Sequence, residues 1–137
     1  MIGSALPYIP QRPPIVMIDY LIEADEKSGI GQFEVKDTTL FLKQGMLMEA
    51  GLIENIAQTA AAWAGYIQSK AQSQVRIGYI ASLNNVSLYN LAPIGSIIKS
   101  SIEVQHTLLN ISIILGKSYH GSTQLCQCEL KIFTVTI

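Results

Sequence analysis

Residues 48–70 read MEAGLIENIAQTAAAWAGYIQSK, and this stretch decides the fold. Its apolar residues recur three and four positions apart, which predicts one helix over the whole stretch. A helix of about 20 residues is roughly 30 Å long, which is the width of a small domain. The alanines at 60–62 and 64 leave little side-chain bulk, so we expect another part of the chain to approach closely on several sides. The sequence therefore predicts a long, central helix.

The chain on either side of this helix favours β-structure. Residues 15–23 are rich in β-branched side chains and residues 30–35 alternate in character, and the two stretches flank a turn at 25–29, which predicts a hairpin. The proline-rich lead, residues 6–14, is expected to be extended. After Ser73 the apolar pattern alternates, and the predicted strands are 76–89, 96–109, 111–119 and 124–135. One helix can be buried by such strands only if the sheet curls around it, so we predict an α+β hot-dog fold with residues 1–137 as a single domain.

The composition limits the classes of function. Of 137 residues, 49% are hydrophobic and 14% are charged, with a net charge of −1. These charged side chains are too few to cover the surface of a small monomer. We therefore expect some apolar surface to be buried between subunits. The absence of a basic run argues against nucleic acid and anionic membranes as partners. No apolar stretch is long enough for a membrane span and no secretory signal pattern opens the chain, so we expect a cytoplasmic protein.

Cys126 and Cys128 lie two positions apart in a predicted strand, too close in sequence for an ordinary disulfide. No second pair of cysteine or histidine residues completes a zinc site. We therefore expect two buried free thiols, no metal site and no cofactor.

Four stretches resemble motifs of one known family. Residues 9–19 read IPQRPPIVMID, residues 54–58 read ENIAQ, and residues 78–81 and 93–95 read GYIA and PIG. In this order they resemble the Leu-Pro-His-Arg-x-Pro-Phe-Leu-Leu-Val-Asp, Glu-Ala-x-Ala-Gln, Gly-Ile and Pro-Gly positions of the hot-dog 3-hydroxyacyl-(acyl-carrier-protein) dehydratases. The AQT at 57–59 is similar to the divergent branch that occurs with polyene and aryl-polyene pigment synthesis.

The resemblance implies an active site shared across a two-fold dimer interface. In the family, a histidine before the helix acts as the base at C2 of the thioester, and an acid on the helix handles the C3 hydroxyl. This implies Glu54 as the acid and Gln58, one turn later, as the side chain that orients it. The family's histidine is expected at position 40, where this chain has Leu40, and no residue from 1 to 105 is histidine.

The loop before the helix supplies the candidate substrate-binding residues. Gly45, Met46 and Glu49 lead into the helix N-terminus, where unpaired N–H groups can polarise a thioester carbonyl. Glu49 fits equally well as a charge that complements the helix dipole. His106 shares an apolar strand face, so we expect it to be interior or interfacial, with a role as substitute base as the alternative. Arg12 could bind a phosphopantetheine phosphate or form an ion pair with an acidic neighbour, Asp19 or Glu23.

The sequence leaves three hypotheses open. The first is a dehydratase, a lyase that acts on the 3-hydroxyacyl thioester of an acyl carrier protein in fatty-acid or polyene synthesis. The second is a non-catalytic acyl-binding subunit that pairs with an active hot-dog enzyme. The third is an acyl thioesterase in which the helix carboxylate activates water. A homodimer, or a heterodimer with a hot-dog homologue, is the expected assembly.

Overall fold

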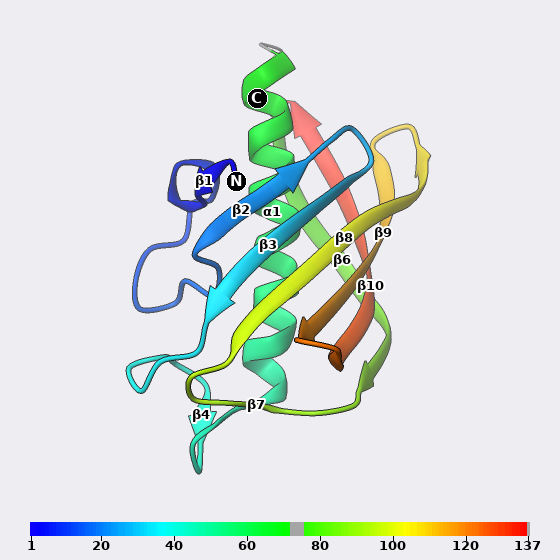
Figure 1. Cartoon of the computed structure of the whole chain (residues 1–137). Coiled ribbons are helices and arrows are strands. Elements are labelled where there is room, and N and C mark those ends of the chain that lie inside the picture. The colour runs from blue at the N-terminus through cyan, green and yellow to red at the C-terminus, as the bar shows by residue number, and fades with distance from the viewer. Residues whose placement is uncertain (72–75, 137) are drawn as a thin grey trace.

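The computed structural model describes residues 1–71 and 76–136, and it shows one long helix partly enclosed by a curved sheet (Figure 1). The helix α1 spans Glu49–Ala71. The large sheet has the strand order β1-β2-β3-β8-β9-β10-β6, and all its neighbouring strands are antiparallel. Its strands are β1 Gly3–Ser4, β2 Tyr20–Ala24, β3 Ser28–Glu34, β6 Arg76–Leu88, β8 Ile97–Leu108, β9 Ile111–His120 and β10 Thr123–Thr136. A small second sheet holds β4 Leu42–Lys43, β5 Met46–Leu47 and β7 Ala92–Pro93.

The predicted hot-dog architecture is confirmed. The helix and the four long strands that follow it begin and end within one residue of the positions predicted from the apolar pattern. No described helix combines the length and apolarity needed to cross a membrane.

Two predictions for the N-terminal part are wrong. The first long strand begins only at Tyr20, because the backbone of residues 15–17 is hydrogen-bonded by side chains of the helix rather than by a neighbouring strand. The proline-rich lead is not extended throughout, since Leu6–Tyr8 form a short 3-10 helix, η1. Pro7 fits there because the first turn of a helix needs no N–H donor.

The core lies between α1 and the helix side of the sheet. Leu52 and Ile56 pack against buried isoleucines of β8 and β9, among them Ile102 and Ile114. The approach is close at Gly116, where a Cβ atom would lie 2.2 Å from Ile56 Cγ2. It is also close at Gly65, where a Cβ atom would lie 2.3 Å from the carbonyl oxygen of Tyr8. The close approach that the sequence predicts is thus present, through Gly65 on the helix and through Gly116 on β9.

Strand β6 closes one end of the sheet and differs from the other long strands. It pairs only with β10, so its second edge has no strand beside it in the described part of the chain. Its side chains Ile80, Leu83 and Leu88 are opposite Ile132, Leu130 and Cys126 of β10. Cross-strand partners share a face of the sheet, so these three side chains point to the helix side. They are nevertheless 42–48% exposed. At these three positions the chain therefore leaves the helix side of β6 only partly covered.

Candidate active site

The loop before α1 is a tight hairpin. Gln44 and Gly45 have φ angles of 53° and 76°, which turn the chain between β4 and β5. The carbonyl oxygen of Gly45 accepts a hydrogen bond from the N–H of Ile94 (2.9 Å), and Met46 pairs with Pro93 of β7. Gly45 and Met46, two of the predicted substrate-binding residues, thus lie in a hairpin that pairs with β7 and hydrogen-bonds Ile94 at the start of the helix.

The helix N-terminus itself has free donors. Leu52 N–H donates to Met48 O (3.1 Å), which makes it the first N–H of the helix with a backbone acceptor. Within the described residues, the N–H groups of Glu49, Ala50 and Gly51 have no hydrogen-bond acceptor. Such donors at the positive end of the helix dipole can polarise a carbonyl group.

Glu54 lies on the second turn of α1 and is half-buried. Its carboxylate forms no hydrogen bond or ion pair with any residue in the described part of the chain. The group is therefore available to a substrate or to a partner subunit.

Gln58 does not orient Glu54, so this expectation is wrong. Its side chain is 1% exposed, and its Oε1 accepts a hydrogen bond from Met17 N–H (2.6 Å). Its Nε2 donates to Ile15 O (3.0 Å). The amide is occupied by the backbone of the N-terminal segment, because that segment has no strand partner there and its polar groups must be paired.

Asn55, next to Glu54, is a buried polar residue that was not predicted from the sequence. It is fully buried, its Nδ2 donates to Met17 O (2.7 Å) and its Oδ1 accepts from the Ser100 hydroxyl. The available signal was a polar residue in the apolar helix pattern where the related motif has alanine. Buried amides are nearly always hydrogen-bonded, so this position implied partners on neighbouring elements.

A base is missing where the resemblance expects one. Leu40 is exposed and lies just before Phe41, whose φ is 64°. The only two histidines, His106 and His120, lie on β8 and β9. His106 is exposed rather than interior, because a bulge between Val104 and His106 interrupts the alternation of the strand.

Arg12 is held by the backbone. Its Nη1 donates to Ile9 O (2.8 Å) and to Gln11 O (2.7 Å). Asp19, one of its two expected ion-pair partners beside Glu23, instead accepts a hydrogen bond from Glu34 N–H (2.8 Å). In the described part of the chain, Arg12 has no carboxylate partner, so the expected ion pair is wrong.

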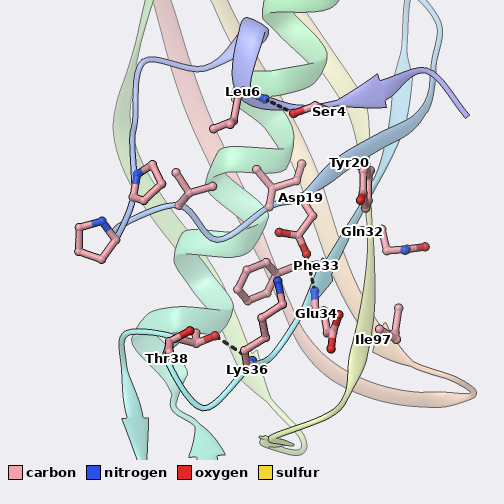
Figure 2. Close-up of a pocket in the computed structure, with 15 residues that line it drawn as sticks. Ser4, Leu6, Asp19, Tyr20, Gln32, Phe33, Glu34, Lys36, Thr38 and Ile97 are labelled. Atoms are coloured by element: carbon pink, nitrogen blue, oxygen red, sulfur yellow. Dashed lines mark hydrogen bonds between the residues drawn. The ribbon is translucent and has the colours of Figure 1, made fainter.

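One hollow of the chain lies away from the helix N-terminus. Figure 2 shows this hollow, of about 680 Å³, between the N-terminal segment and strands β2 and β3. It combines apolar side chains such as Leu6 with charged ones such as Asp19 and Lys36. Neither Glu54 nor Gln58 lines this hollow.

The two cysteines are free and buried, as predicted. Burial, with a smaller contribution from the charge of Glu49, raises the pKa of Cys126. Burial and the neighbouring Cys126 raise the pKa of Cys128 to about 12. Both are therefore neutral thiols at physiological pH and are poor metal ligands. The described residues contain no cluster of three or more histidine, cysteine or acidic side chains that could hold a metal ion.

Comparisons with known proteins agree with this architecture. A chain of the dehydratase heterocomplex ApeI:P from Xenorhabdus doucetiae superposes with a TM-score of 0.86 at 19% identity, covering 97% of this chain and 91% of that one. A mutant hypothetical thioesterase from Streptococcus pneumoniae TIGR4 gives 0.70 at 9% identity, covering 86% and 91%. The PaaI protein of E. coli gives 0.66 at 11% identity, covering 82% and 80%.

The sequence comparisons are more specific. A search of curated proteins gives no significant match. The family model for the ApeP-like dehydratases matches residues 4–136, which is nearly the whole chain. The resemblance to hot-dog dehydratases is thereby confirmed, and the chain belongs to the ApeP-like dehydratase family.

Proposed function

We propose that this chain is a single hot-dog domain that forms one subunit of a heterodimeric dehydratase. Its substrate is the 3-hydroxyacyl thioester of an acyl carrier protein, in fatty-acid or polyene synthesis. The proposal rests on the observation that this chain holds only part of a catalytic site. Glu54 offers a carboxylate with no partner in the described chain, whereas position 40 carries Leu40 in place of a base.

The proposed reaction is an elimination. The partner subunit's base removes a proton from C2, and the electron pair of that C–H bond forms the C2–C3 double bond. The C3–O bond breaks, and Glu54 donates the proton with which the hydroxyl leaves as water. The free N–H groups of Glu49, Ala50 and Gly51 stabilise the negative charge that develops on the thioester oxygen.

Two features of strand β6 are evidence for a two-subunit assembly. Its unpaired edge and its exposed apolar side chains on the helix side are features that a soluble protein normally covers. A second hot-dog chain would supply a strand for the edge and a helix for the uncovered side. The ApeI:P structure is described as a heterocomplex, which supports a different hot-dog chain as the partner. The fold likeness to thioesterases at about a tenth identity favours no particular chemistry.

The activity test compares this chain alone with its complex with a hot-dog partner, using a 3-hydroxyacyl carrier protein as substrate. We expect little or no dehydration by the chain alone and clear activity of the complex. Glu54→Gln in the complex should lower kcat by about 10²-fold or more, because a positioned acid contributes about that factor. Glu129→Gln, a half-buried carboxylate on the outer face of β10, is the matched control and should leave kcat unchanged. Robust activity of the chain alone, or full activity of Glu54→Gln, would overturn the proposal.

A second test addresses the assembly. Leu83→Asp places a charge among the exposed apolar side chains of β6 and should weaken the complex about 30-fold or more, since an unpaired charge at an interface is costly. Asn84→Asp adds the same charge one position along the strand on the opposite face and should have a much smaller effect. Analytical ultracentrifugation distinguishes the complex from the 15.0 kDa chain. Equal effects of the two substitutions would place the interface elsewhere.

A further inference from the structure

The helix carries a buried polar junction at the level of the proposed acid. Asn55 follows Glu54 directly and is fully buried. Its side-chain amide joins α1 to two other elements, through Met17 O (2.7 Å) in the N-terminal segment and through the Ser100 hydroxyl on β8. The residue is thus hydrogen-bonded on both sides while its neighbour Glu54 has no partner in the described chain.

Gln58 extends this junction by one turn. Its amide accepts from Met17 N–H (2.6 Å) and donates to Ile15 O (3.0 Å). These are the two backbone groups that a neighbouring parallel strand would use to pair with Val16. The side chains of Asn55 and Gln58 therefore hold residues 15–17 against the helix in place of a strand.

We infer that Asn55 is a positioning residue that fixes the rotation of α1 about its axis and so holds the carboxylate of Glu54 in place. The inference rests on the proposed function, in which Glu54 is the acid. It adds a positioning role for Asn55, a residue that does not touch the substrate.

Rotation of the helix matters because it displaces the carboxylate of Glu54. On the side of Asn55 the helix presents small residues such as Gly51 and Ala62, and apolar contacts between small groups have no preferred direction. Hydrogen bonds, by contrast, weaken steeply when their angle changes. A carboxylate about 6 Å from the helix axis moves roughly 1 Å when the helix turns by about 10°. A misplacement of that size can slow a reaction about 10²-fold.

The matched pair of variants is Asn55→Ala and Thr59→Val. Thr59 is also fully buried, but its hydroxyl donates to Asn55 O (2.7 Å) within the same helix and forms no hydrogen bond to another described element. In the complex with the hot-dog partner, both variants should lower the melting temperature. Only Asn55→Ala should lower kcat, about 10-fold to 100-fold, with KM nearly unchanged. Equal losses of kcat in the two variants would show a merely structural role and overturn the inference.

Two further variants protect the test. Ser100→Ala removes only the hydrogen bond from β8, so it should fold where Asn55→Ala does not, and it should show a smaller loss of kcat. The double variant Asn55→Ala with Glu54→Gln should be no slower than Glu54→Gln alone, because Asn55 acts through Glu54. A further loss in the double variant would overturn the inference.

The design separates this inference from the proposed function. If Glu54→Gln keeps full activity, the proposed function fails whatever Asn55→Ala does. If Glu54→Gln is inactive while a folded Asn55→Ala complex keeps full kcat, only the positioning role fails.

Discussion

Strands β8 and β6 lie in the same curved sheet, and both turn large apolar side chains toward the helix side, yet they differ in what covers them. Ile98 and Ile102 of β8 are completely buried beneath α1. Ile80 and Leu83 of β6, at the end of the sheet, remain exposed. The difference shows that one helix covers only part of its own sheet. The uncovered part is where a second subunit would complete the core.

We expect the largest difference in stability between the two strands when a large apolar side chain is replaced by alanine. Ile102→Ala should lower the free energy of unfolding by about 2–5 kcal/mol, because it leaves a cavity in a packed core. Leu83→Ala in the chain alone should cost less than about 1 kcal/mol, since the side chain is already half in water. Urea unfolding measures both.

The same experiment repeated on the complex sharpens the contrast. Adding the partner should increase the effect of Leu83→Ala and leave that of Ile102→Ala nearly unchanged. An effect of Leu83→Ala as large as that of Ile102→Ala in the chain alone would break the comparison.

Two strand glycines give a second, smaller contrast. Gly116→Ala would place a Cβ atom 2.2 Å from Ile56 Cγ2, so we expect a loss of about 1–3 kcal/mol from overpacking. Gly78→Ala on β6 meets its nearest atom at 3.4 Å, and it should be neutral or stabilising by up to about 1 kcal/mol. Thermal unfolding of the two variants checks the signs. A destabilised Gly78→Ala chain would mean that β6 is packed against something other than solvent.

The periodic parts of this fold could be predicted from the sequence. The helix at Glu49–Ala71 and the four strands after it have a clear apolar period, and their positions follow from local pattern alone. The membership of the dehydratase family could also be recognised, because its motifs lie on these elements. The exposure of β6 could not, since its apolar pattern equals that of a covered strand and coverage depends on the whole topology.

The polar contacts of the N-terminal segment could not be predicted either. Residues 15–19 have the composition of a strand, and only the distant amides of Asn55 and Gln58 take up the backbone groups of 15–17. Likewise, the predicted pairing of Gln58 with Glu54 considered only neighbours within the helix. In the structure, Gln58 instead accepts a hydrogen bond from Met17 N–H, 41 residues away in sequence.

Cys128 lies on β10, between the covered strand β9 and the exposed strand β6. The stability of the chain at alkaline pH therefore tests whether α1 shields β10 from water. Burial raises the pKa of Cys128 to about 12, above the value near 8.5 of an unfolded thiol. Between these values the unfolded state releases a proton that the folded state keeps, so the free energy of unfolding falls as pH rises. The stabilisation is fully present below about pH 8.5.

We expect the loss to reach about 1 kcal/mol one pH unit above 8.5. Other groups titrate in this range, so the measurement is the difference between the native chain and Cys128→Ala in urea unfolding at each pH. Identical pH profiles for the two chains would show that the thiol reaches water and that the cover ends before β10.

A last contrast concerns two serines that face each other beneath α1. Ser100 on β8 and Ser118 on β9 are a register pair, and both are fully buried. The Ser100 hydroxyl donates to Asn55, whereas the Ser118 hydroxyl has no hydrogen-bond partner among the described residues. Removing a paired buried hydroxyl leaves its partner unsatisfied, but removing an unpaired one relieves a desolvated polar group. Ser100→Ala should therefore cost about 1–2 kcal/mol, and Ser118→Ala should be neutral or stabilising by a few tenths of a kcal/mol. Urea unfolding of the two variants decides the point, and a loss at Ser118 equal to that at Ser100 would mean that its hydroxyl has a partner, such as a bound water, inside the covered half of the sheet.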